Sequence, residues 1–331
     1  FSSSGANPNN DLQLPQPPSD GISAVRWAPT GNFLAASSWD KTVRVWEISS
    51  QGQAQVKLGK QFDSPLTTCD WSGDGSKLFT AHIDGKVNMM DAATQTVNQV
   101  GMHKVGLQAM QFIPELNLLV SGGWDKMLRY WDCRQANPAV TVELPHPVFS
   151  LDVKHPLLVL ADADKHVAVF NLQNPQQVFK YEKSTLSKQI RCVSAFPQKD
   201  GYIITSVEGR CALLYLQPQP GNRQHENFSF RCHRAGSNCY PVNDVTFHQF
   251  GTFATGGADG KFNFWDKANR QRLKEFQKMP NSVTSVRFNS SGELFAYGVS
   301  YDWSKGSEGV NSSTNNNNIY VHAVQAVEVT P

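Results

Sequence analysis

The stretch ISAVRWAPTGNFLAASSWDKTVRVWEI, residues 22–48, contains three segments of alternating apolar residues separated by two polar turns. A related stretch, LQAMQFIPELNLLVSGGWDKMLRYWDC, occupies residues 107–133. In both stretches an aspartate of the second turn is followed six residues later by a tryptophan, as Asp40 is by Trp46. Alternation with a period of two is typical of β-strands that bury one face. Each stretch therefore predicts three antiparallel strands, and the recurrence of the pattern predicts a repeat protein.

Seven such units begin near residues 22, 66, 107, 148, 190, 242 and 283. An acidic turn residue recurs every 39 to 51 residues, at Asp40, Asp84, Asp125, Asp164, Glu208 and Asp259. This period matches a four-stranded blade of a β-propeller. A short carboxylate at the turn accepts backbone hydrogen bonds. Six positions later a large apolar residue is expected to pack between blades: Trp46, Met90, Trp131, Phe170, Leu214 or Trp265. We predict an all-β, single-domain, seven-bladed WD-repeat β-propeller.

The ends of the chain and the last repeat are less regular. We expect a disordered leader over residues 1–10 and the propeller over residues 11–331. An open ring would leave two unpaired sheet edges, and residues 11–14 are favoured over residues 326–329 as the strand that closes it. The polar run at 304–318 interrupts the seventh repeat. Its composition predicts disorder over 307–318 and order near Tyr301–Trp303.

Composition narrows the class of protein. The 331 residues are 40% hydrophobic and 11% aromatic, enough to bury a sizeable core. Thirty basic and twenty-eight acidic residues exclude a strongly polycationic nucleic-acid binder but allow a local basic patch. No apolar run approaches the roughly 18 residues of a membrane-spanning helix, so no membrane insertion is expected. The six cysteines form no CxxC pair, and no signal peptide is visible, so free thiols in a reducing compartment are expected.

No set of residues in the sequence predicts catalysis. The sequence contains no HExxH, GxSxG or phosphate-loop motif, so we expect neither an enzyme nor a cofactor. The group His225, Cys232, His233 and Cys239 matches no common zinc spacing. The adjacent Cys232 and His233 would also point to opposite faces of a strand. No metal site is predicted there.

A basic run in and after the sixth repeat is the most distinctive local feature. It comprises Lys261, Lys267, Arg270, Arg272, Lys274 and Lys278. Arg210, Arg231 and Arg234 precede it, and Phe228, Phe230 and Trp265 lie among these residues. Arginine beside an aromatic ring is common at binding surfaces, and arginine binds carboxylates and phosphates with two bonds. The alternative is an ordinary solvated face above core aromatics.

Several segments together resemble the WD-repeat nuclear mRNA export factor family, first described as an RNA export factor and as a GLFG-lethal partner in fungi. They are PPSDGISAVRWAP, SSWDKTVRVWEI, SVEGR, FRCHR, YPVNDVTFH, TFATGGADGKFNFWDK and SYDWSKG. The resemblance runs from about Leu12 to Val324. A sister family, the mitotic checkpoint propeller, has similar SVEGR, CHR and ATGGADG segments, but SYDWSKG and SSWDKTVRVWEI are more similar to the export factor.

The resemblance implies a seven-bladed propeller in the nucleus, at the nuclear envelope in the nuclear pore complex, and also in the cytoplasm. It implies binding to the GLEBS docking segment of an FG-repeat nucleoporin, with mRNA and spindle or checkpoint proteins as further partners. It also implies a basic groove with an apolar pocket for RNA or acidic partners. The residues that match are Arg210 in SVEGR, Phe230 in FRCHR, and Trp265, Asp266, Lys267, Arg270 and Arg272 in FWDKANRQR. The alternative is a checkpoint adaptor that binds GLEBS-like segments of kinases.

Overall fold

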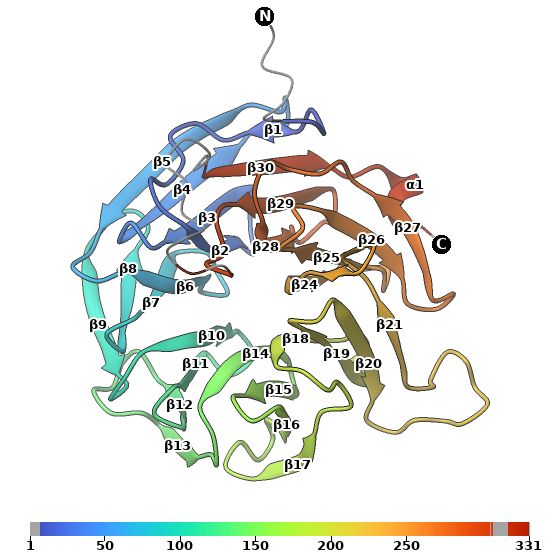
Figure 1. The fold of residues 1–331 in the computed structure, drawn as a ribbon. Helices are drawn as coiled ribbons and strands as arrows, with labels where there is room; N and C mark the ends of the chain where they lie inside the picture. The colour runs from blue at the N-terminus through green and yellow to red at the C-terminus, as the bar shows by residue number, and fades with distance from the viewer. Residues whose placement is uncertain (1–6, 305, 307–316, 331) are drawn as a thin grey trace, which may run out of the picture.

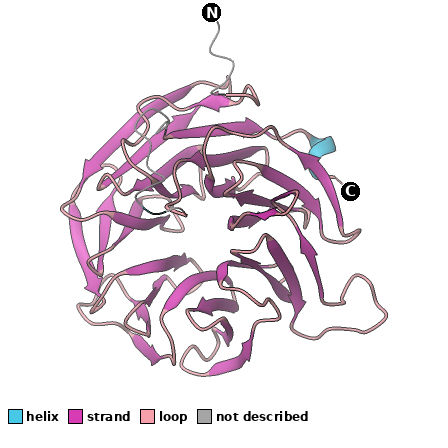
Figure 2. Ribbon diagram, in the orientation of Figure 1, coloured by secondary structure: helices cyan, strands magenta, loops and turns pink. Residues whose placement is uncertain are grey.

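The computed structural model describes residues 7–304, 306 and 317–330. Its main sheets are seven four-stranded antiparallel blades arranged in a ring, which confirms the predicted all-β, seven-bladed propeller (Figure 1). Strands dominate the described part of the chain, and its one helix, α1 (Ala326–Val329), lies near the C-terminus (Figure 2). In that part, no helix is long and apolar enough to cross a membrane.

Each blade takes its four strands in chain order, except the last. Blade 1 consists of β2 (Ile22–Trp27), β3 (Phe33–Ser38), β4 (Thr42–Ile48) and β5 (Ala54–Gln61). Blade 2 consists of β6 (Leu66–Trp71), β7 (Lys77–His82), β8 (Lys86–Asp91) and β9 (Val97–Met102). Blade 3 consists of β10 (Leu107–Ile113), β11 (Leu118–Gly123), β12 (Met127–Trp131) and β13 (Val140–Glu143). Blade 4 consists of β14 (Val148–Lys154), β15 (Leu157–Asp162), β16 (His166–Asn171) and β17 (Val178–Lys183).

Blade 5 consists of β18 (Ile190–Ala195), β19 (Gly201–Ser206), β20 (Arg210–Tyr215) and β21 (Phe228–Arg231). Blade 6 consists of β24 (Val242–Phe247), β25 (Phe253–Gly257), β26 (Phe262–Asp266) and β27 (Gln271–Glu275). A small hairpin of β22 (Arg234–Ala235) and β23 (Asn238–Cys239) separates them. Blade 7 consists of β28 (Val283–Phe288), β29 (Leu294–Val299), β30 (Asn318–Ala323) and β1 (Leu12–Gln13).

The ring is closed by the N-terminal strand. β1 pairs with β30, with Leu12 opposite Val321 and Gln13 opposite Tyr320. Residues 326–329, the alternative closing strand, form helix α1 instead. Leu14, which follows β1, still donates its N–H to the Ile319 carbonyl at 2.9 Å, but Pro15 has no backbone N–H to continue the ladder. The fourth strand of blade 7 is therefore supplied from the opposite end of the chain.

A buried polar cluster reinforces this closure, and we call it the closure clasp. Nδ1 of His322 lies 2.6 Å from Asp11 Oδ1, and Nε2 lies 2.8 Å from Glu328 Oε2. Lys274 contacts the same glutamate, and the Tyr297 hydroxyl donates to Asp11 at 2.7 Å. Burial opposes the charged imidazolium, but the bonds to the two carboxylates outweigh it and raise the pKa of His322. The clasp thus joins Asp11, the residue before β1, to β30, α1 and β27.

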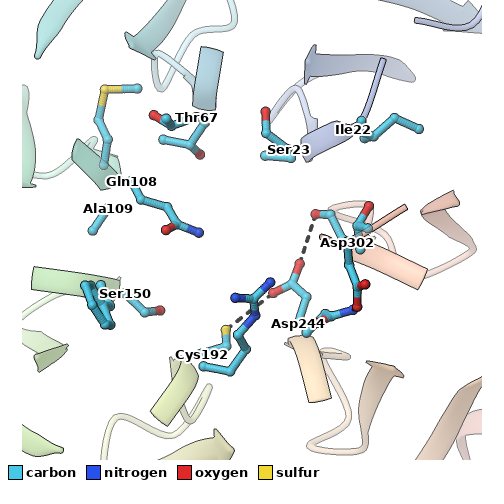
Figure 3. A pocket seen from close by; sticks show the side chains of 18 of the residues that line it. Ile22, Ser23, Thr67, Gln108, Ala109, Ser150, Cys192, Asp244 and Asp302 are labelled. Atoms are coloured by element: carbon cyan, nitrogen blue, oxygen red, sulfur yellow. Dashed lines mark hydrogen bonds between the residues drawn. The ribbon is translucent and has the colours of Figure 1, made fainter. Parts of the chain in front are cut away.

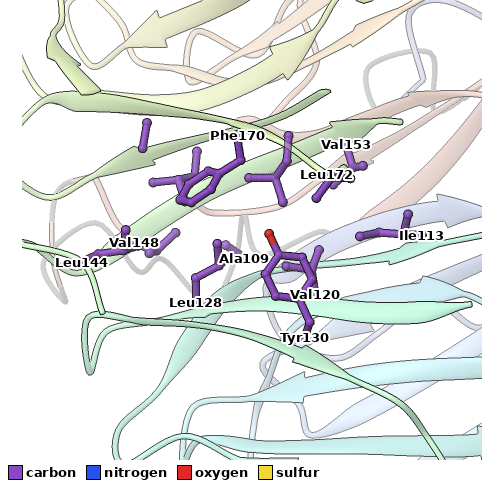
Figure 4. Close-up of a cluster of buried hydrophobic side chains, with 13 residues drawn as sticks. Ala109, Ile113, Val120, Leu128, Tyr130, Leu144, Val148, Val153, Phe170 and Leu172 are labelled. Carbon is purple, nitrogen blue, oxygen red and sulfur yellow. The ribbon is translucent and has the colours of Figure 1, made fainter. Parts of the chain in front are cut away.

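The apolar core is divided among the spaces between neighbouring blades. Figure 4 shows one such cluster, in which Val120, Leu128 and Tyr130 of blade 3 meet Val148 and Phe170 of blade 4. The aromatic or aliphatic residue six positions after each turn acid lies in a cluster of this kind, as predicted. Trp46, Met90, Trp131, Phe170, Leu214 and Trp265 each pack with residues of the preceding blade. Burial is therefore shared by adjacent blades, which explains why the repeat keeps this position large and apolar.

Most of the acidic turn residues organise the turn before the third strand. The carboxylates of Asp40, Asp84, Asp125 and Asp259 each accept the backbone N–H two residues later, at 2.9 to 3.3 Å. In the fourth repeat this position belongs to Asp162, which accepts the N–H groups of Asp164 and His166, both at 2.9 Å. The side chain of Asp164, where the sequence pattern places the turn acid, is 57% exposed. The sequence pattern allows either Asp162 or Asp164 to be the acid that accepts the backbone N–H groups of the turn. The backbone conformation gives this role to Asp162.

The predicted leader and insertion fall partly outside the described residues. Residues 1–6, 305 and 307–316 are outside them. Asn9, within the predicted leader, exchanges hydrogen bonds with Gln277 at 2.9 and 3.3 Å, so the expected disorder does not extend to it. Asn318, assigned to the insertion, is the first residue of β30 and pairs with Val299. All six cysteines are free thiols.

Candidate functional site

Aromatic rings gather where blade 5 meets blade 6. Phe228 and Phe230 alternate with exposed residues along β21, so both rings face blade 6 and are half-buried. The Phe230 ring lies 4.7 Å from the Trp265 ring and 6.2 Å from the Phe253 ring. We call Phe228, Phe230, Trp265, Lys267 and Arg270 the blade 5–6 cluster. Four of these five, all except Phe228, were predicted from the sequence as partner-binding residues.

The indole N–H of Trp265 is used in a hydrogen bond within the protein. It donates to the Thr255 hydroxyl at 2.9 Å, and that oxygen lies 2.8 Å from Nε2 of His233. Nδ1 of the same histidine lies 2.9 Å from Asp259. Blade 3 repeats this chain of contacts with different residues. Trp265 therefore offers a partner the surface of its half-buried ring, since its one hydrogen-bond donor is already used.

Two cations lie over aromatic rings of blade 5. Nζ of Lys267 is 4.1 Å from the centre of the Phe196 ring, and the Arg270 guanidinium carbon is 4.4 Å from that of Phe228. Burial lowers the pKa of Lys267. Arg270 pairs with Glu226 at 3.1 Å, and its Nε is buried with no hydrogen-bond partner among the described residues. Both cations are held in place by contacts with blade 5.

The remaining predicted site residues have other positions. Asp266 is buried and accepts bonds from Ala268 and Asn269, so its carboxylate shapes the turn after β26. Arg272 is exposed and pairs with Glu275 at 2.9 Å. Arg210 starts β20 opposite Arg231, and it takes no part in the ring and charge contacts described for the cluster. The structure brings four of the seven predicted residues into the blade 5–6 cluster and leaves Asp266, Arg272 and Arg210 outside it.

Carboxylates offset much of the basic run that the sequence shows. Glu275 contacts both Lys261 and Arg272, Glu226 contacts Arg270, and Glu328 contacts Lys274. The cations that face a common hollow are nevertheless in excess. A small cavity of about 100 Å³ is lined by Arg234, Lys261, Arg272 and Lys278, with Asp259 and Glu275. Four cationic groups against two carboxylates leave this hollow positive, and it shares Arg272 with the predicted site.

A larger hollow opens at one end of the propeller axis, where the first strands converge. Its volume is about 570 Å³, and residues from all seven blades line it (Figure 3). Five aromatic residues surround it: Trp39, Trp124, Phe149, Tyr301 and Trp303. We call these five the aromatic mouth. Trp39 is 38% exposed and Trp303 is 51% exposed, so large rings are open to solvent beside a concave surface.

A set of seven polar side chains, one from each blade, lines a second hollow of about 470 Å³ and was not singled out from the sequence. It consists of the fifth residue of each first strand: Arg26, Asp70, Gln111, Asp152, Ser194, Thr246 and Arg287. Several of these groups bond to the next blade, as Asp70 does to the Phe112 N–H at 2.7 Å and Asp152 to the Ala195 N–H at 2.8 Å. A polar residue recurs at the fifth position of the first strand in every blade, and this recurrence in the sequence could have identified the seven residues.

Asp244 is the most heavily bonded acid of this region. Its two oxygens each lie 2.9 Å from Nη1 of Arg287. It also accepts the N–H groups of Val245 and Val286 and the hydroxyl of Ser285, each at 2.9 Å. Burial opposes ionisation, but Arg287 and the hydrogen bonds outweigh it and lower the pKa of Asp244. An ionised aspartate in the centre of the ring thus joins blade 6 to blade 7.

The four residues first considered as a zinc group have separate surroundings. His233 belongs to the Thr255–Trp265 chain, and the Cys232 sulfur lies 3.5 Å from the Cys211 sulfur. His225 lies 3.8 Å from Asp200, and Cys239 is exposed on β23. Strand β21 ends at Arg231, and His233 has a positive φ of 49°. Cys232 and His233 therefore lie in the connection between β21 and β22, and not on one strand as expected from the sequence.

Comparison with known proteins places this architecture in a family. The sequence profile of the WD domain, G-beta repeat matches residues 12–47, 95–132 and 225–266. The chain is 40% identical to the Poly(A)+ RNA export protein of Schizosaccharomyces pombe, over 97% of this chain and 92% of that protein. It is 40% identical to mRNA export factor GLE2 of Chaetomium thermophilum, with the same two coverages. It is 42% identical to Protein RAE1 of Arabidopsis thaliana, over 98% of this chain and 93% of that protein. The chain belongs to the WD-repeat mRNA export factor family, whose propeller is a non-enzymatic scaffold.

Proposed function

We propose that this chain acts in mRNA export at the nuclear pore complex, by binding the GLEBS docking segment of an FG-repeat nucleoporin and by contacting RNA or an acidic partner. The names of the relatives, which refer to RNA export, support the process. The blade 5–6 cluster supports the mode of binding, because it holds cations over aromatic rings beside a positive hollow. On this proposal the protein is found in the nucleus, at the nuclear envelope and in the cytoplasm.

The observation that carries the RNA contact is the arrangement of Lys267 and Arg270. Each cation is braced on a ring at 4.1 or 4.4 Å, so little side-chain freedom is lost when a phosphate binds. The exposed Arg272 extends the same surface toward the positive hollow. The half-buried rings of Phe230 and Trp265 give an unpaired base or an apolar side chain a surface to pack on.

The test is salt-dependent binding of a single-stranded RNA to the wild-type chain and to Lys267→Glu/Arg270→Glu. Each lost phosphate contact lowers the slope of log affinity against log salt by about 0.7 on a single strand, so the loss of both contacts lowers it by at most about 1.4. The matched control is Lys60→Glu/Lys104→Glu, which makes the same change in net charge on blade 1 and at the blade 2–3 junction. Because Arg270 pairs with Glu226, the thermal melting of each variant is compared first. Unchanged affinity of the first variant at low salt overturns the RNA proposal.

We assign the nucleoporin segment to the aromatic mouth. Peptide-binding surfaces concentrate their free energy in a few large aromatic residues beside a concavity. Here exposed tryptophans adjoin a hollow of about 570 Å³ whose wall also offers polar groups such as Gln108 and Asn243. Trp303→Ala and Trp39→Ala should each cost about 2 kcal/mol of binding free energy, roughly thirtyfold in affinity.

Calorimetry of the chain against a GLEBS peptide tests this assignment, with a checkpoint-kinase peptide as comparator. Tight one-to-one binding to the nucleoporin segment, weakened by Trp303→Ala, is the expected result. Phe179→Ala is the control, since Phe179 is an aromatic ring even more exposed than the two tryptophans, at 67%, on the outer edge of blade 4. Preference for the kinase peptide would assign the chain to the checkpoint adaptor function. Tight binding that neither tryptophan affects would refute the aromatic mouth as the docking surface.

A further inference from the structure

Three potential metal ligands meet on blade 4, and none of them belongs to the blade 5–6 cluster or the aromatic mouth. His146 lies in the loop before β14, Asp164 lies in the turn between β15 and β16, and His166 is the first residue of β16. One ligand atom from each of the three lies within 4.8 Å of the other two. Asp164 is central, with Oδ2 3.6 Å from Nδ1 of His166 and 3.8 Å from Nε2 of His146.

The two separations from Asp164 are close to those of a zinc site, and the two imidazole nitrogens lie within 4.8 Å of each other. Zinc–ligand bonds of about 2.0 to 2.1 Å in a tetrahedron place neighbouring ligand atoms roughly 3.3 Å apart. The two distances to Asp164 exceed this value by a few tenths of an ångström. Asp164 is 57% exposed and His146 is 37% exposed, so small rotations of these two side chains close the difference. The separations are also too long for hydrogen bonds, so the carboxylate does not satisfy the imidazoles.

An unsatisfied nitrogen points to a missing ligand. Nδ1 of His166 is buried and has no hydrogen-bond partner among the described residues. The carboxylate oxygens closest to it, those of Asp162 and Asp164, lie at 3.8 and 3.6 Å. A buried polar atom without a partner costs stability, and most such atoms in proteins are bonded to something. A cation that accepts the nitrogen lone pair would satisfy it.

The backbone around the three residues is fixed before any ion binds. Asp162 accepts the N–H groups of both Asp164 and His166 at 2.9 Å. The Ala163 N–H donates to the Pro147 carbonyl at 2.9 Å, which ties the two loops together. The His166 ring lies nearly parallel to the Tyr181 ring at 4.9 Å and to the His146 ring at 5.8 Å. The Tyr181 hydroxyl in turn donates to Asp162 at 2.7 Å, so a second layer of contacts orients the site.

We propose that His146, Asp164 and His166 form a binding site for Zn²⁺. Two imidazoles and one carboxylate are a ligand set that suits zinc and neighbouring transition metals rather than Mg²⁺ or Ca²⁺. Three protein ligands leave a fourth position for water or for a donor group of a bound partner. The site lies on the same side of the propeller as the aromatic mouth, because Phe149 of that mouth follows His146 by three residues.

The test is equilibrium zinc binding to the untagged full chain carrying Cys239→Ser, which removes the exposed thiol. We expect one Zn²⁺ per chain, and a loss of affinity of about tenfold or more in each of Asp164→Asn and His166→Ala. The control is His225→Ala, which breaks a similarly spaced histidine–aspartate pair of 3.8 Å that has no third ligand. It should leave zinc affinity unchanged. Co²⁺ titration gives a second readout, because a four-coordinate site has a strong visible absorption that Asp164→Asn should abolish.

The outcomes separate clearly. No zinc binding to the wild-type chain overturns the proposal, as does one-to-one binding that Asp164→Asn and His166→Ala leave unchanged. Asp164 is exposed and its backbone, not its side chain, bonds to the turn, so its replacement preserves the fold even if His166→Ala does not. Binding weakened equally by His225→Ala would indicate nonspecific surface histidines and would also overturn it.

Discussion

Replacing Asp244 by alanine is the sharpest test of how the centre of the propeller is held together. The carboxylate is buried, with 6% of the residue exposed, and Arg287 lies 2.9 Å from both of its oxygens. Removing one partner of a buried ion pair costs about 3 to 5 kcal/mol, because the other charge is left without compensation. The lower end applies here, since Asp244 also lines the 570 Å³ hollow and water can reach the vacated space. We therefore expect Asp244→Ala to lose about 3 kcal/mol of unfolding free energy.

Urea unfolding followed by tryptophan fluorescence measures this loss as a shift of the midpoint at constant slope. Asp63→Ala is the control, because Asp63 is exposed, and its change should stay within about 0.5 kcal/mol. The double variant Asp244→Ala/Arg287→Met removes both charges and should be more stable than the sum of the single changes by at least about 0.5 kcal/mol. A cost below about 1 kcal/mol for Asp244→Ala, or strict additivity with Arg287→Met, would refute the ion-pair argument.

Three further changes test other parts of the fold. Thr255→Val keeps the shape of the side chain but leaves the Trp265 N–H and the His233 nitrogen unpaired, so it should cost about 1 to 3 kcal/mol by urea unfolding. Gly122→Ala places a Cβ 2.5 Å from Val148 across the blade 3–4 interface and should destabilise the chain by about 1 to 3 kcal/mol, whereas Gly59→Ala, with open space around it, should not. His322→Gln should destabilise most below pH 6.5, and the difference from wild type should shrink as pH rises through the raised pKa of His322 in the folded chain. A difference that is independent of pH would contradict the charge in the closure clasp.

The sign of the clasp effect follows from the direction of each pKa shift. The pKa of His322 is raised above its ordinary 6.5, so its stabilising charge is complete below that pH and is lost at higher pH. Burial opposes ionisation of Glu328, but Lys274 and His322 outweigh it and lower the pKa below 4.5, so the carboxylate stabilises above that pH and is lost on acidification. The clasp is therefore strongest between the two ranges.

The ring architecture could be predicted from the sequence because one structural unit recurs seven times. An apolar residue six positions after each turn acid marks a side chain that packs between neighbouring blades. Phe170 and Leu214 pack there although the strongest repeats have tryptophan at this position. The turn acid itself is more ambiguous. The turn around residues 162–166 contains Asp162 and Asp164, and the backbone conformation alone selects Asp162 as the acceptor.

The candidate site was less accessible to sequence reasoning, because its properties depend on pairs distant in the chain. Neither the contact of Lys267 with Phe196 nor the pairing of Arg270 with Glu226 has any local signal. The indole of Trp265 appears in the sequence as a free aromatic beside arginines, yet its N–H is bonded to Thr255. His146 and His166, separated by a whole hairpin, match no metal spacing and meet only in the folded blade.

Charge compensation at the blade 5–6 junction constrains what a partner must supply. A phosphate that binds Arg270 must displace or share the guanidinium with Glu226, which lies 3.1 Å away. A contact of this kind exchanges one anion for another and releases fewer counterions than a contact to an unpaired cation. Lys267 has no carboxylate within 4 Å among the described residues and is held by rings instead, so it should carry more of the salt dependence than Arg270. Lys267→Gln alone should then lower the salt slope by nearly the full 0.7 expected for one contact, and Arg270→Gln by less. Equal slopes for the two single variants would show that Glu226 does not compete with the ligand.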